Sequence, residues 1–193
     1  MKFVISSPLR RCLETTQETF KNHKNKPKVV VWPIVKEMLL SGCDVSDDLA
    51  TIKKEFPEAD FSLVDALPHP ELWLVHMLKN ETIVNEIFED LFAKYPNKEE
   101  AYKNAKFFLT DKLKHTYPAL VESLMDINQR VLEAKERLKP LVKELKDDEV
   151  IVVVSHSRFL EAFCSESFAE SGEPVNAKWF ANCEVAAWNI LDN

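Results

Sequence analysis

Two short segments carry the side chains best suited to bind an anion. One contributes His156, which follows the β-branched run at 150–154 with a single serine between them. The other contributes Arg10 and Arg11, whose guanidinium groups can each hold a phosphate through two parallel hydrogen bonds. A histidine imidazole can donate or accept a hydrogen bond and can move a proton near neutral pH. Together these residue types predict an anion site.

The elements around these residues place them at the edge of a predicted sheet. The run at 150–154 is typical of a strand buried on both faces of a parallel sheet, and ligands bind beyond the carboxyl ends of such strands. Residues 3–5 predict another strand, after which Ser7 and Pro8 predict a helix start with both arginines in its first turn. Cations are unfavourable there, so a bound anion would explain them. Two plainer readings stay open: a turn histidine that bonds its own loop, and two solvated arginines.

The segments SSPLRRCLETT at 6–16 and IVVVSHSRFLEAF at 151–163 together resemble the histidine phosphatase superfamily, also called phosphoglycerate mutase-like. Residues 32–38 are similar to the strand that leads to an acidic residue in this family, and 122–130 to the helix before its second histidine. Residues 41–61 are similar to a eukaryotic branch of the family. The resemblance covers most of the chain and implies an α/β fold: a three-layer α/β/α sandwich around a mixed sheet.

The resemblance also assigns roles to individual residues. Arg11 aligns with the arginine that clamps the phosphate, and Arg10 occupies the neighbouring position, which is more often exposed. His156 aligns with the second histidine, which hydrogen-bonds the phosphoryl oxygens. Glu37 aligns with the general acid that protonates the leaving group, and the alternative reading is a solvated glutamate near a strand end. Ser157 stands where the family usually has glycine.

The segment that carries the family's nucleophile has no counterpart in this sequence. Family enzymes begin with a strand that ends in Arg-His-Gly, and no Arg-His pair occurs here. The chain starts at the family's second strand, and a strand pattern directly after Met1 favours a natural start. We therefore expect a sheet without its first strand, which in the family lies between the 150–154 strand and the C-terminal strand. The other four histidines are expected to be structural: His23, His69, His76 and His115.

The composition narrows the class of protein. With 193 residues, 46% of them hydrophobic, we expect one domain at 1–193. A net charge of −7 argues against general nucleic-acid binding. Two glycines exclude a P-loop or a dinucleotide fingerprint, and four scattered cysteines lack zinc-site spacing, so we expect no cofactor and no metal. Without an apolar run of ~20 residues or a signal-peptide pattern, we expect no membrane span and an intracellular, cytoplasmic protein.

Residue spacing also predicts further elements. Helical spacing recurs within residues 71 to 117, and the resemblance implies that this region is a cap insertion beside the site. We interpret its aromatic residues as packing rather than as a ligand or partner surface. An apolar stripe over 120–141 predicts a helix that Pro140 kinks or ends near the preceding residue. Residues 181–190 predict a last strand.

Three readings of the function follow. In the first, the chain is a pseudoenzyme with a residual phosphate pocket that acts as a binding or structural subunit. In the second, it is a truncated chain of an active phosphomonoesterase whose catalytic histidine lies upstream of Met1. In the third, the fold is purely structural and binds no phosphate. The retention of Arg11, Glu37 and His156 favours the first two, and we adopt the first.

The missing strand would leave a gap in the expected sheet, and three arrangements could fill it. The segment Val185–Ile190 can close against the 150–154 strand, another polypeptide can supply a strand, or two copies can pair edge to edge. We rank a hetero-protein partner or a closed gap above a homodimer, because the negative charge disfavours casual self-association.

Overall fold

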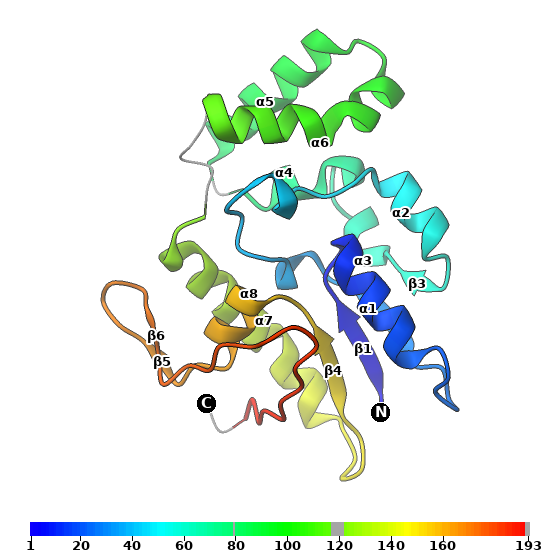
Figure 1. Cartoon of the computed structure of the whole chain (residues 1–193), viewed down its shortest axis with the longest axis vertical. Coiled ribbons are helices and arrows are strands. Elements are labelled where there is room, and N and C mark those ends of the chain that lie inside the picture. Colours follow the sequence, from blue (N-terminus) through cyan, green and yellow to red (C-terminus); the bar gives the residue numbers. More distant parts are fainter. Residues whose placement is uncertain (79, 117–121, 192–193) are drawn as a thin grey trace.

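A four-stranded parallel sheet with helices packed around it forms the centre of the protein, as the computed structural model in Figure 1 shows. The structure describes residues 1–78, 80–116 and 122–191. The strands lie in the order β3-β2-β1-β4, and every neighbouring pair is parallel. Their bounds are β1 Phe3–Ser6, β2 Lys28–Val31, β3 Ala59–Asp60 and β4 Ile151–Val154. A separate antiparallel pair joins β5 Ser167–Phe168 to β6 Pro174–Val175.

Helices connect and flank these strands. The α-helices are α1 Arg10–Phe20, α2 Leu49–Glu55, α3 Ser62–Asp65, α4 Trp73–His76, α5 Glu81–Lys94, α6 Lys98–His115, α7 Leu124–Lys143 and α8 Ser157–Phe163. Three 3₁₀ turns complete the described elements: η1 Pro33–Val35, η2 Gly42–Asp44 and η3 Pro70–Leu72. Within the described ranges, no helix is both long enough and apolar enough to cross a membrane.

The three long strands end level with one another. The register pairs Ser6 of β1 with Val31 of β2 and with Val154 of β4. The residues that follow therefore leave the sheet at one edge, which is the edge where ligands bind in parallel sheets. Those residues are Ser7, Trp32 and Ser155.

The predicted sheet is wrong in two respects. The four described strands form a parallel sheet and not a mixed one, and its fourth member is β3. Residues 181–190 form no strand, so Val185–Ile190 does not close against β4. Phe180 and Ile190 are buried and anchor the two ends of this segment, whereas Val185 between them is 90% exposed. The apolar residues between these two anchors are exposed, so they do not mark a paired strand.

The burial predicted for β4 is also too high. All four residues of β4 are half-buried, and Val150 before it is 54% exposed. In the described sheet β4 has β1 on one side and no strand on the other, so it is an edge strand. A β-branched run does not distinguish an edge strand from a central one, because both can cover an apolar core on one face.

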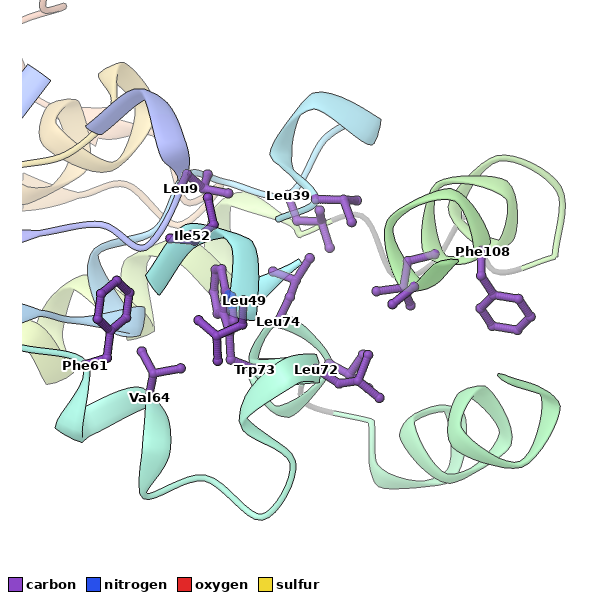
Figure 2. Packing of buried hydrophobic residues seen from close by; sticks show 14 of the residues in the cluster. Leu9, Leu39, Leu49, Ile52, Phe61, Val64, Leu72, Trp73, Leu74 and Phe108 are labelled. Carbon is purple, nitrogen blue, oxygen red and sulfur yellow. The ribbon is translucent and has the colours of Figure 1, made fainter. Parts of the chain in front are cut away.

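Two clusters of buried side chains hold the elements together. One joins β1 to α7 and α8 and includes Ile5, Ile127 and Phe159. The other joins α1 and β2 to α2, α4 and the α5–α6 pair, and part of it appears in Figure 2. Each fully buried aliphatic or aromatic side chain in them contributes about 1.5–3 kcal/mol.

The predicted cap region is helical in its described part. Residues 79 and 117 lie outside the described residues, and between them α5 and α6 pack against each other at one end of the molecule (Figure 1). The stripe predicted over 120–141 corresponds to α7, although residues 120 and 121 also lie outside the described part. Pro140 lies inside α7, which continues to Lys143, so the helix does not end near Lys139, and the kink that was the other predicted outcome stays a prediction. One missing N–H removes a single hydrogen bond and does not stop a helix that is buried along one side.

Candidate anion-binding site

Arg11 and His156 meet at the edge where β1 and β4 end. Arg11 lies in the first turn of α1, and His156 is the N-cap residue of α8. Although they are 145 positions apart in sequence, Arg11 Nε donates a hydrogen bond to His156 Nδ1 at 3.1 Å. The two residues that the resemblance assigns to one phosphate site therefore lie in direct contact.

The other donors of Arg11 are directed at acceptors of this chain. One terminal nitrogen donates to the carbonyl oxygen of Cys43 at 2.8 Å, and the other to Asp44 Oδ1 at 3.1 Å. The Arg11 side chain is 45% exposed, whereas that of Asp44 is 8% exposed. Three of the five N–H groups of the guanidinium are thus engaged, and an approaching anion finds the remainder at an open face.

His156 is a buried, neutral imidazole. Because Nδ1 accepts from Arg11, the ring proton lies on Nε2, which is 2.9 Å from Ser7 Oγ. Burial lowers the pKa of His156 to about 3, with further lowering by the positive charges of Arg11, Arg130 and Lys36. His156 as a whole is only 6% exposed to solvent. In this arrangement His156 is a hydrogen-bonding group and not a cation.

The contact between Ser7 and His156 has the wrong polarity for nucleophilic catalysis. A general base would have to accept the hydroxyl proton at Nε2, but Nε2 carries its own proton here. Cys12 is also close, with its sulfur 3.4 Å from His156 Nε2. Burial raises the pKa of the Cys12 thiol to about 12, so the reactive thiolate is not formed near neutral pH. Neither side chain is activated as a nucleophile in this arrangement.

The side chain of Glu37 contacts the N-terminus of α8, the helix that His156 caps. Its Oε1 accepts hydrogen bonds from the backbone N–H groups of Met38 at 2.9 Å and Phe159 at 3.3 Å. The second of these bonds gives α8 an acidic partner at its N-terminus, as the helix dipole favours. Burial raises the pKa of Glu37 above its ordinary value, against the lowering effect of these hydrogen bonds. The alternative reading of a freely solvated glutamate is wrong, because the side chain is half-buried and bonded.

Arg10 is held by carboxylates and not by an empty anion site. Its Nε donates to Asp47 Oδ2 at 2.9 Å, and its terminal nitrogen pairs with Glu55. Hydrogen bonding to Asp47 is the largest of the effects that raise the pKa of Arg10. The two cations in the first turn of α1 are therefore balanced by acidic residues of the 44–55 region, which the sequence did not indicate.

A buried cluster of charges beside Glu37 was also missed. Glu122 accepts from Lys36 Nζ at 2.6 Å and, with both oxygens, from Arg130 Nε and a terminal nitrogen at 3.1 and 3.0 Å. Arg130 also donates to the carbonyl oxygens of Ile34 and Lys36 at 2.9 and 2.7 Å. This cluster ties the turn before Glu37 to α7. Glu122 and Arg130 follow Lys36 by 86 and 94 positions in the sequence, so no local pattern could reveal the cluster.

The other histidines and the cysteines form no further site. His69 and His76 stack on each other with ring centroids 5.7 Å apart and contact Phe88, while His23 and His115 are exposed. All four cysteines are free. The described part of the chain contains no group of three or more His, Cys, Asp or Glu side chains that could hold a metal ion.

Comparisons of this chain with models of protein families, with curated proteins and with solved structures gave no match. The geometry of the strand edge is therefore the evidence on which a function must be argued.

Proposed function

We propose that this protein is a phosphoglycerate mutase-like α/β/α protein that binds a phosphate group at Arg11 beside His156 and forms no phosphohistidine. In this proposal it acts as a binding or structural subunit. The observation that carries the proposal is the 3.1 Å contact between Arg11 and His156, two residues that the sequence resemblance assigns to one phosphate site. The shared edge of β1 and β4, where parallel sheets bind ligands, supports it.

The chemistry of the site favours binding over turnover. A half-exposed guanidinium can offer charge-assisted hydrogen bonds to a phosphate. Covalent phosphoryl transfer needs a nucleophile with a free lone pair, and the Nδ1 lone pair of His156 is engaged by Arg11 while Nε2 is protonated. Charged groups alone leave only a small part of an enzyme's rate acceleration once the nucleophile is absent.

Titration calorimetry with inorganic phosphate tests the binding directly. Charge-assisted bonds of ~1.5–3 kcal/mol each, offset by the cost of association, give an expected dissociation constant on the order of millimolar. Arg11→Ala should abolish the heat of binding. Arg137→Ala, which removes an exposed arginine paired with Glu133 on α7, is the matched control and should bind like the wild type. Binding that survives Arg11→Ala unchanged would remove the case for this pocket.

A second candidate is a phosphomonoesterase whose catalytic histidine lies outside this sequence. The observation that favours it is Glu37, because a carboxyl group whose pKa is raised by burial is better suited to donate a proton to a leaving group. Both candidates predict that this chain hydrolyses p-nitrophenyl phosphate no faster than buffer, and a chain extended upstream of Met1 distinguishes them, because only the second predicts that an upstream Arg-His-Gly segment restores hydrolysis. Robust turnover by the present chain that His156→Ala abolishes would contradict both and show that His156 has taken the nucleophile's role.

The proposal includes a hetero-protein partner that pairs with the open edge of β4. The half-buried residues of β4 and the 54% exposed Val150 support it, because unpaired strand edges attract other strands. Hydrogen exchange of the isolated chain should show unprotected amides along β4, and sedimentation should show a monomer. A monomer whose β4 amides are all protected would argue against a partner strand.

A further inference from the structure

The carboxylate of Asp44 already occupies the guanidinium that the proposed phosphate site needs. Asp44 Oδ1 accepts from a terminal nitrogen of Arg11 at 3.1 Å, and the neighbouring Cys43 carbonyl oxygen accepts from the other at 2.8 Å. These are the nitrogens through which an arginine grips a phosphate with two parallel bonds. A carboxylate of this chain therefore holds the position of a ligand.

Asp44 is fixed in this position by its own turn. Its second oxygen, Oδ2, accepts from the backbone N–H groups of Leu40 at 3.2 Å and Ser41 at 3.1 Å. Ser41 and Asp44 also form a capping box around η2, in which the Ser41 side chain accepts from the Asp44 backbone. Asp44 is 6% exposed, so its carboxylate is almost entirely buried in the protein.

Helix α6 holds the same turn from the far side. A Cβ atom on Gly42 would lie 2.5 Å from Thr110 Cγ2, so glycine allows η2 to approach α6 this closely. Further along the loop, Asp47 connects α6 to α1, since it accepts hydrogen bonds from Lys106 of α6 at 2.6 Å and from Arg10 of α1 at 2.9 Å. The turn that carries Asp44 is thus clamped between α1 and α6.

We propose that Asp44 is a built-in competitor that occupies Arg11 in the absence of ligand, so that an incoming phosphate must displace it. The inference rests on the proposed function, and it adds that an internal carboxylate holds one of the two terminal nitrogens that a phosphate would grip. A phosphate that binds Arg11 through both terminal nitrogens must therefore compete with Asp44 for that nitrogen and for the positive charge. The clamp between α1 and α6 makes displacement costly and keeps the resting affinity for phosphate low.

Asp44→Asn tests the inference with the fewest other changes. The amide oxygen can still accept from the Leu40 and Ser41 N–H groups, but the negative charge beside Arg11 is gone. Phosphate should bind roughly tenfold more tightly than to the wild type, which corresponds to about 1.4 kcal/mol. Asp65→Asn is the matched control, because it removes one charge from an exposed pair with Lys53 and should leave the affinity unchanged.

The outcomes separate the inference from the function on which it rests. If the wild type binds phosphate through Arg11 and Asp44→Asn binds no more tightly, the competitor role is overturned and the binding function stands. If phosphate binds neither the wild type nor Asp44→Asn, both are overturned. Should Asp44→Asn fail to fold, Ser41→Ala replaces it: loss of the capping hydroxyl loosens Asp44 without a change of charge and should raise the affinity by a smaller factor, whereas an unchanged affinity would contradict the competitor role.

Discussion

Two of the arginine–carboxylate pairs in this protein use the same groups in different ways. Arg130 and Glu122 are 5% and 9% exposed, and Arg130 donates to Glu122 and to the carbonyl oxygens of Ile34, Lys36 and Glu37. Arg11 and Asp44 are 45% and 8% exposed, so one side of the pair faces solvent. The difference lies in whether the guanidinium retains an open face. The first pair stabilises the fold, and the second is the one that we propose a phosphate displaces.

The largest expected effect comes from breaking the buried pair of Arg130 and Glu122. Arg130→Met leaves Glu122 buried with Lys36 alone and should destabilise the protein by about 3–5 kcal/mol, because an incompletely paired buried charge is costly. Urea denaturation measures this loss. Arg137→Met, also on α7, breaks an exposed pair with Glu133 and should cost less than about 1 kcal/mol. Similar losses of stability in the two variants would contradict the distinction between a buried and an exposed pair.

The pH dependence of stability tests whether His156 is buried as a neutral ring. Its pKa is lowered from 6.5 to about 3 in the folded protein, so the unfolded chain binds the proton more readily between these values. The stability that His156 contributes is full above pH 6.5 and is lost as the pH falls, by about 2 kcal/mol between pH 7 and pH 5.

Comparison with a variant isolates this contribution from the other titrating groups. Over that range His156→Gln should lose about 2 kcal/mol less than the wild type, as followed by urea denaturation at each pH. His115→Gln, which changes an exposed histidine, should follow the wild-type curve. A wild type and a His156→Gln variant with parallel pH profiles would mean that His156 is not buried as a neutral ring.

The smallest effect concerns the start of α7, which presents Arg130. Ser123 accepts from the backbone of Asp126 in a capping box, so Ser123→Ala should cost about 1 kcal/mol in thermal or urea denaturation. Phosphate affinity should not change, since Ser123 supports the buried pair of Arg130 and Glu122 and not Arg11. A loss of phosphate binding in Ser123→Ala would show that the two pairs are coupled.

Sequence reasoning brought Arg11 and His156 to one edge of the sheet but did not find the groups that pair with Arg11. Local patterns are enough to predict β1, β4 and a helix after β1, and parallel pairing then brings Arg11 to His156. The predicted start of that helix at Ser7 and Pro8 is wrong, because α1 begins at Arg10 with Leu9 as its N-cap residue. The acceptor for Arg11 could not be predicted, because Asp44 lies 33 positions away in a turn without regular periodicity. Lys36 reads as a surface lysine, and only its ion pair with Glu122 makes its burial tolerable.

The C-terminal segment shows the same limit in the fold. Residues 181–190 alternate like a strand, yet pairing depends on an available strand edge and on the path of the chain, which a local pattern does not contain. In the structure Phe180 and Ile190 pack against the α7–α8 side of the sheet instead. Long-range placement decided both the segment's path and the closure of the site.

The central claim is that Arg11 and His156 form a phosphate site that needs no phosphohistidine. The most direct measurement is a ¹⁵N NMR titration with inorganic phosphate that follows the Nε–Hε signals of Arg11 and Arg130 and the ring nitrogens of His156. The account predicts that the Arg11 and His156 signals move together along one millimolar saturation curve, while Arg130, sealed against Glu122, stays unmoved. Arg11 and His156 signals that do not respond to phosphate, or that move only together with Arg130, would contradict it.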